Sequence, residues 1–442
     1  MLKEATVAIL QKMQITDVLR IMQHLPVVAQ GEKQHTLTLG TCGAGTESAF
    51  DVLKDVQQAA TRELNLDIPA LEHTWHVEPN RDARVRAMNT MGMEHVFGKP
   101  SETGIAFEET AGMSIAIPKV TTVVGSVENL SNVRAWRTQQ VGGSSEDNRD
   151  GSYDALMAAI AKSDPCYVII RMSSKRFSTV LTNQAHGVVC RDLQELGYKT
   201  FELEPDPQDF GSFISGARPF IIAVRGGSVH GRPLVVLNSM KVERGPLSQL
   251  LNSPNSPEGA KVARPKSTNS PEKGAKDIPK SVEDNHYMIY RENDMDYPPQ
   301  VTDLLKTLGR KVLDRVLQLP RSEQEVVFFV EQVCKMNAAG PDDDAVIDLS
   351  SLKGAIDDAK TVNMLPSLTN RSAMWARRKG RELEFGELRR ALLGTETLVF
   401  GNEQHGMLAE DAKQLLSRSM NGFVVGALMC TCWCIAGNAR SD

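Results

Sequence analysis

Apolar and polar positions alternate along the first half of the chain in blocks typical of strands followed by helices. Short apolar runs predict strands at 36–40, 74–77, 120–124, 167–170 and 220–224. Apolar residues at helical spacing predict helices at 1–30, 48–64, 81–91, 153–161 and 181–196. Because strands that alternate with helices need crossover connections, we expect an α/β domain whose mostly parallel sheet has helices on both faces.

The pattern changes near residue 240. Residues 252–281 are rich in Ser, Pro, Asn, Gly and Lys and contain almost no large apolar side chains. Such a segment cannot offset the entropy lost on ordering, so we predict a disordered loop. Amphipathic helices are predicted at 300–317 and 322–336, and helical patterns return near 387–393, 409–416 and 423–435.

Length and composition restrict the class of protein. At 442 residues, the chain is long enough for two domains. Its net charge of −5 gives no overall basic field for nucleic acid, although a local basic groove remains compatible with it. Seven scattered cysteines indicate a reducing compartment rather than a disulfide scaffold. Without a signal-peptide pattern or an apolar run of about 18 residues, we expect a nuclear or cytoplasmic protein that does not span a membrane.

A glycine-rich segment follows the first predicted strand. It reads Thr41-Cys42-Gly43-Ala44-Gly45, and glycines between a strand and a helix let the backbone approach a cofactor. Glu78 ends the next predicted strand, where an acidic residue can bind ribose hydroxyls. Ser48 stands where a dinucleotide fingerprint would have its third glycine. The pattern therefore favours S-adenosylmethionine over a dinucleotide.

The order of these segments resembles that of the DNA cytosine-5 methyltransferase family. TCGAG is similar to the family's first motif, with Thr41 in place of Phe, and residues 75–89 are similar to the second, with Glu78 as the ribose carboxylate. Residues 193–224 form the most recognisable stretch, and Asn421 matches the last motif. The resemblance covers about 36–235 and 365–437.

This resemblance implies a class I S-adenosylmethionine-dependent methyltransferase fold, with a Rossmann-like sheet and an inserted recognition-type domain. The methyltransferase-like domain would comprise residues 1–238 and 383–442, and the target-recognition-like domain would comprise 239–382. The implied site residues for S-adenosylmethionine are Thr41, Cys42, Gly43, Gly45, Glu78 and Asn421. Nucleic acid, DNA by resemblance, would lie between the domains.

The positions that carry the family's chemistry have changed. Residues 125–132 match the fourth motif in spacing, but Val127-Glu128 stand where the family has Pro-Cys. A carboxylate is a poorer nucleophile than a thiolate toward the C6 carbon of cytosine. By the resemblance, Arg171 stands where the family has a glutamate that holds the flipped base. Of the two arginines in another of the family's motifs, this sequence keeps one, Arg218. We therefore expect a degenerate homologue that binds the cofactor, nucleic acid or both.

Other interpretations stay open. Glu128-Asn129 could act as a general base in an active methyltransferase with an altered substrate or mechanism. A further hypothesis is an interaction module that uses helices 300–336 to bind a protein partner. In an alternative register, residues 128–130 would be the family's Glu-Asn-Val motif. Pro165-Cys166 precedes a predicted strand, at the edge opposite to the ligand edge, which argues against a nucleophile there.

A metal site is not expected. Cys430, Cys432 and Cys434 lie in an apolar helical pattern without a neighbouring histidine or a second cysteine pair, so the spacing of zinc ligands is missing. His73, His76 and His95 lack such a spacing as well, and we assign these histidines surface or core roles.

Overall fold

The computed structural model describes most of residues 37–63, 70–78, 95–98, 105–127, 152–172, 179–251, 346–350, 372–394 and 419–436, with short gaps and some isolated positions elsewhere. The predicted helices at 1–30, 81–91, 300–317, 322–336 and 409–416 lie largely or wholly outside the described residues, as does the predicted loop at 252–281. By its contacts the chain divides into two compact units, Met1–Gly245 with Arg389–Asp442, and Pro246–Leu388.

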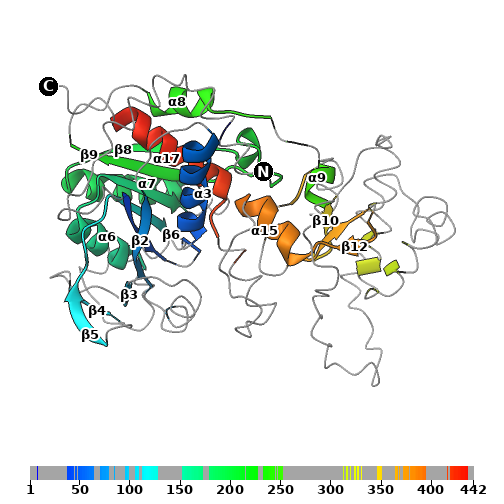
Figure 1. Ribbon diagram of the computed structural model, residues 1–442, viewed down its shortest axis with the longest axis horizontal. Coiled ribbons are helices and arrows are strands. Elements are labelled where there is room, and N and C mark those ends of the chain that lie inside the picture. Colours follow the sequence, from blue (N-terminus) through cyan, green and yellow to red (C-terminus); the bar gives the residue numbers. More distant parts are fainter. Residues whose placement is uncertain are drawn as a thin grey trace. The chain divides into compact units, whose positions relative to one another are not determined.

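The described part of the first unit is built on a nine-stranded sheet (Figure 1). In spatial order its strands are β5 (Met113–Ala116), β4 (Ile105–Glu108), β3 (His95–Phe97), β2 (Leu71–Val77), β1 (Leu37–Cys42), β6 (Thr122–Val127), β7 (Tyr167–Met172), β9 (Phe220–Arg225) and β8 (Tyr198–Leu203). From β3 to β7 all neighbours are parallel, whereas β9 is antiparallel to both β7 and β8. The predicted mostly parallel sheet is confirmed.

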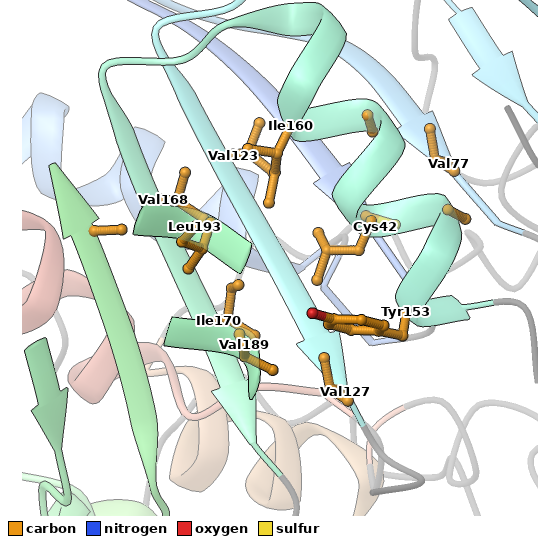
Figure 2. Packing of buried hydrophobic residues seen from close by; sticks show 14 of the residues in the cluster. Cys42, Val77, Val123, Val127, Tyr153, Ile160, Val168, Ile170, Val189 and Leu193 are labelled. Atoms are coloured by element: carbon orange, nitrogen blue, oxygen red, sulfur yellow. The ribbon is translucent and has the colours of Figure 1, made fainter. Parts of the chain in front are cut away.

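Helices cover both faces of this sheet. Side chains of β1, β6 and β7 such as Cys42, Val123 and Ile170 pack with α6 (Ser152–Ser163) and α7 (Thr179–Glu195), as Figure 2 shows. Because side chains alternate along a strand, their neighbours in sequence point to the other face. That face carries α3 (Ser48–Glu63) and α17 (Gly422–Ala436), which pack side by side. The short helix α8 (Pro233–Ser239) packs on α17.

Two glycines allow close packing on the α6 side. A Cβ atom at Gly125 would lie 2.5 Å from a methyl carbon of Leu156 on α6, and one at Gly40 would lie 2.2 Å from the ring of Trp75. The pairing of β1 with β2 shifts between Leu39 and Gly40, where the register passes from His73 to Trp75. Because of this shift, the Trp75 indole lies over Gly40 of β1, which has no side chain to occupy the same space.

The second unit contains a three-stranded antiparallel sheet of β10 (Val346–Asp348), β11 (Met374–Ala376) and β12 (Arg381–Glu382), preceded by α9 (Leu247–Leu251). Burial alone would raise the pKa of Asp348, but its carboxylate accepts hydrogen bonds from the Ser372 hydroxyl and from two backbone N–H groups, and together these lower the pKa. Helix α15 (Phe385–Leu393) runs across the boundary between the two units. That this unit recognises a target stays a prediction.

One buried carboxylate, that of Glu387, organises the chain around residue 385. Arg381 donates two hydrogen bonds of 2.7 Å to the carboxylate of Glu387, which is only 1% exposed. The same carboxylate accepts the N–H of Glu384, so it caps the first turn of α15. The bidentate pair raises the pKa of Arg381.

Candidate functional site

The carboxyl ends of β1, β2, β6 and β7 meet at one edge of the sheet, where ligands of open α/β sheets bind. The glycine loop leaves β1 at this edge. Gly43 and Gly45 have φ angles of +91° and +83°, which favour glycine, and a Cβ on Gly43 would lie 3.2 Å from the hydroxyl of Ser126 on β6. The Gly43 N–H donates to the Val77 carbonyl at the end of β2. The loop is therefore hydrogen-bonded to β2 and lies close against β6.

Hydroxyl groups inside the loop fix its turn into α3. The Thr46 hydroxyl donates to the Gly43 carbonyl at 2.7 Å, and the Ser48 hydroxyl donates to the Gly45 carbonyl at 3.1 Å. Both side chains are buried. Ser48, at the position of the missing third glycine, thus serves the start of α3, whose first amide groups are suited to a negative or electron-rich ligand.

Glu78 follows β2 directly and lies beside the end of β1. Its N–H donates to the Phe97 carbonyl at 3.0 Å, and its carbonyl accepts a 2.9 Å hydrogen bond from Arg84. The side chain is 5% exposed. Burial, and then the charge of Glu78, raise the pKa of the Cys42 thiol. The structure therefore brings the predicted residues Cys42, Gly43 and Glu78 to one place, with Cys42 as a neutral thiol.

The Thr41 hydroxyl belongs to an interior network. It lies 2.8 Å from His73 Nε2 and 2.9 Å from His76 Nδ1, so it can donate to one ring and accept from the other. The Phe50 ring on α3 stacks on His73 with centroids 5.2 Å apart. Burial lowers the pKa of both histidines to about 3, so both rings are neutral at physiological pH. That Thr41 binds cofactor stays a prediction; its described partners are these two rings.

Asn421 directly precedes α17 at the same edge. Its side-chain oxygen accepts the Val424 N–H, as expected of an N-cap, and its amide nitrogen donates to the Ser212 hydroxyl at 2.9 Å. The preceding residue, Met420, donates its N–H to the Gly45 carbonyl. Both polar ends of the Asn421 side chain are thus engaged within the protein, in a position next to the glycine loop.

The predicted catalytic residues are only partly described. Arg171, near the end of β7, is half-buried and donates from Nη1 to the Ser419 carbonyl at 3.0 Å. Arg218 is exposed, just before β9. Strand β6 ends at Val127, and Glu128 and Asn129 lie outside the described residues. Their catalytic roles stay predictions.

Cys430, Cys432 and Cys434 lie on α17. Burial raises the pKa of Cys430 to about 12 and that of Cys432 further. Within the described ranges, no group of three or more His, Cys, Asp or Glu side chains could hold a metal ion. In the same residues, no helix is long and apolar enough to cross a membrane.

Asp51 in the first turn of α3 gives a testable pH effect. Burial and then the charge of Asp55 raise its pKa to about 7, against 3.8 ordinarily. Because the folded state keeps a proton that the unfolded state releases, this group reduces stability as the pH rises from about 4 to 7. We expect Asp51→Asn to stabilise the protein by ~2 kcal/mol at pH 8 and to have little effect at pH 4.

Urea unfolding of the Asp51 variant at both pH values measures this effect. Asp154→Asn, in the first turn of α6, is the matched control for the loss of an acidic group near a helix N-terminus. An equal change in unfolding free energy at the two pH values would contradict the prediction.

Sequence reasoning missed three residues that shape this edge. Ser126 limits the space beside Gly43, Ser212 holds Asn421, and Arg84 holds the backbone of Glu78. Ser126 could have been found as the polar residue at the end of an apolar strand. The contacts of Ser212 and Arg84 depend on segments that meet only in the folded chain.

The glycine loop after β1, the acidic residue after β2 and the run of parallel strands from β3 to β7 agree with the predicted architecture. The fold is that of a class I methyltransferase. No family model and no curated protein matches the sequence.

Solved structures that the chain resembles include DNA methyltransferase-like proteins. One is a candidate DNA modification methyltransferase encoded within an E. coli prophage, with 10% identity over 90% of this chain and 99% of that one and a TM-score of 0.46. Another is the Entamoeba histolytica methyltransferase EhMeth, with 10% identity, coverages of 90% and 98%, and a TM-score of 0.42. Dnmt2 from S. pombe has 12% identity, coverages of 89% and 97%, and a TM-score of 0.39. At these identities the likeness concerns the fold.

Proposed function

We propose that this methyltransferase-like protein binds S-adenosylmethionine at the carboxyl edge of its sheet. The observation that carries the proposal is the buried Glu78 carboxylate beside a glycine loop with two positive φ angles, on adjacent strand ends. A carboxylate in this place can accept hydrogen bonds from both ribose hydroxyls. S-adenosylmethionine itself would supply an electrophilic methyl group.

The residues of the glycine loop fit such a ligand. Gly43 leaves space where a Cβ would meet Ser126, and so lets the backbone approach a bound molecule. The N-terminal amides of α3 would favour the carboxylate of the ligand's amino-acid part. Cys42, as a neutral buried thiol, would contribute an apolar wall and no nucleophile.

We further propose that the covalent cytosine-5 mechanism is lost and that a binding role remains, with nucleic acid, DNA by resemblance, as the second ligand. Glu128 replaces the nucleophilic thiol in the sequence. Arg171, in place of the base-holding glutamate, donates to the Ser419 carbonyl and cannot accept a hydrogen bond from a base amino group. A protein partner for the segment 300–336 and a nuclear or cytoplasmic location stay predictions.

Titration calorimetry with S-adenosylmethionine and S-adenosylhomocysteine tests the cofactor site. We expect binding to the wild type and at least about a tenfold loss of affinity in Glu78→Ala, because charged hydrogen bonds contribute ~1.5–3 kcal/mol each. Glu72→Ala is the matched control, since Glu72 is an exposed glutamate on the same strand. Equal affinities of wild type and Glu78→Ala would contradict the site, as would a wild type that binds neither ligand.

Transfer of a labelled methyl group to duplex DNA and to RNA separates the two functional hypotheses. A binding protein shows no transfer. If transfer occurs and is abolished in Glu128→Gln while cofactor affinity is kept, Glu128 acts as a general base and the protein is an active methyltransferase with an altered mechanism.

A further inference from the structure

A short segment, Ser419 to Asn421, connects helix α17 to the candidate cofactor site. Met420 donates its N–H to the Gly45 carbonyl, and Asn421 donates to the Ser212 hydroxyl. The next residue, Gly422, begins α17, and a Cβ there would lie 2.4 Å from the Leu393 carbonyl oxygen. The segment is therefore closely packed against its neighbours, and it contacts the glycine loop through the Gly45 carbonyl.

Arg171 supplies the charged contact to this segment. In the sheet register it pairs with Ser126 on β6 and with Phe220 on β9, so its side chain lies on the face of the sheet that carries α17. Its Nη1 donates to the Ser419 carbonyl at 3.0 Å, across 248 residues of sequence. A hydrogen bond from a half-buried guanidinium is stronger than one between neutral groups.

The two contacts lie within one peptide unit of each other. The Ser419 carbonyl that accepts from Arg171 and the Met420 N–H that donates to Gly45 belong to the same peptide group. Because that peptide group is planar and rigid, a hydrogen bond at one end fixes the direction of the other. Polarisation of the carbonyl by the guanidinium also strengthens the N–H as a donor.

We propose that Arg171 is a positioning residue that holds this peptide group against the Gly45 carbonyl and so keeps the glycine loop in its cofactor-binding shape. The inference rests on the proposed cofactor site for its functional consequence, whereas the coupling itself can be measured without a ligand. Arg171 stands where the resembled family has a glutamate that holds the base. In this protein its side chain instead donates a hydrogen bond to the Ser419 carbonyl.

Hydrogen exchange of the ligand-free protein tests the coupling. In Arg171→Met, we expect the amides of residues 419–421 and of the glycine loop to exchange about tenfold faster, because a charged hydrogen bond is lost from the segment. Arg171→Lys keeps one charged donor and is expected to restore most of the protection. Unchanged exchange in these peptides in Arg171→Met would overturn the proposal.

Arg225→Met is the matched control. Arg225 lies at the other end of β9, where it pairs with Asp164 and packs on the Tyr198 ring, and so it tests for general destabilisation of the same sheet. We expect Arg225→Met to lower the melting temperature without faster exchange in residues 419–421. Equal acceleration there by both variants would show a merely structural role for Arg171 and would overturn the proposal.

Calorimetry with S-adenosylmethionine then measures the consequence. A severalfold weaker affinity in Arg171→Met, with near wild-type affinity in Arg171→Lys and Arg225→Met, supports the proposal. Faster exchange in Arg171→Met with unchanged affinity would overturn its functional part. If the wild type binds no cofactor, the proposed function fails, and the exchange data still decide whether Arg171 holds the peptide group.

Discussion

Replacing Gly40 with alanine is expected to lower the free energy of unfolding strongly. The added Cβ would lie 2.2–2.5 Å from three ring carbons of Trp75, well inside van der Waals contact. The indole is fully buried, and its Nε1 donates to the Pro118 carbonyl at 3.0 Å. Because both packing and this hydrogen bond hold the ring, the strain must spread into the pairing of β1 with β2.

The expected cost is at least ~3 kcal/mol, at the upper end of what overpacking of a core usually causes. That is a large share of a typical folding free energy of about 5–15 kcal/mol. Urea unfolding followed by tryptophan fluorescence and circular dichroism measures it, and a low yield of folded protein is the extreme form of the same result.

Gly187→Ala is the matched control for this substitution. Gly187 lies on the exposed face of α7, and a Cβ there meets nothing within 4 Å. Alanine is the better helix former, so this variant is expected to gain ~0.5–1 kcal/mol. If Gly40→Ala unfolded at the same urea concentration as the wild type, the close contact with Trp75 would be wrong.

Acid is expected to destabilise the protein steeply between about pH 6.5 and pH 3. His73 and His76 have pKa values near 3 in the folded state, against 6.5 ordinarily. Over this range the unfolded chain binds protons that the folded chain excludes, so stability falls as the pH falls. Each histidine contributes up to ~1.4 kcal/mol per pH unit.

The unfolding free energy as a function of pH tests this in the wild type and in a His73→Gln/His76→Gln variant. The variant should show a shallower slope between pH 6 and pH 4, at the cost of some stability at pH 7.5, where the wild-type rings are neutral. Identical slopes would contradict the buried network with Thr41. Asp51 has the opposite effect on the pH dependence, because its contribution to stability increases as the pH falls. Combining Asp51→Asn with the histidine variant separates the two contributions to the slope.

Local sequence patterns predicted the interior of the first unit. Strands β1, β6, β7 and β9 were visible because each is a short, nearly continuous apolar run, as expected for strands buried on both faces. Helices α3, α6, α7 and α17 were visible through their spacing and length. The glycine loop and Glu78 could be placed at one edge because carboxyl ends of parallel strands meet there.

Elements at the sheet margin were missed. Strand β8 has a half-exposed pattern at one edge, and β5 has three exposed residues out of four at the other. Edge strands need fewer apolar side chains, so hydrophobic runs do not mark them. The sequence also could not predict that β9 is antiparallel to its neighbours, because the direction of a buried strand depends on its connections and not on its composition.

The sequence by itself determined the α/β class, the candidate cofactor residues at the ends of β1 and β2, and the presence of Val127-Glu128 where the resembled family has Pro-Cys, because each depends on local spacing or residue identity. Only the tertiary structure decided that Thr41 bonds two neutral histidines, that Asn421 caps a helix and holds Ser212, and that Arg171 reaches Ser419. These contacts join segments up to 248 residues apart. A polar side chain takes whichever partner the fold brings within hydrogen-bond distance, and that partner has no signature in the local sequence.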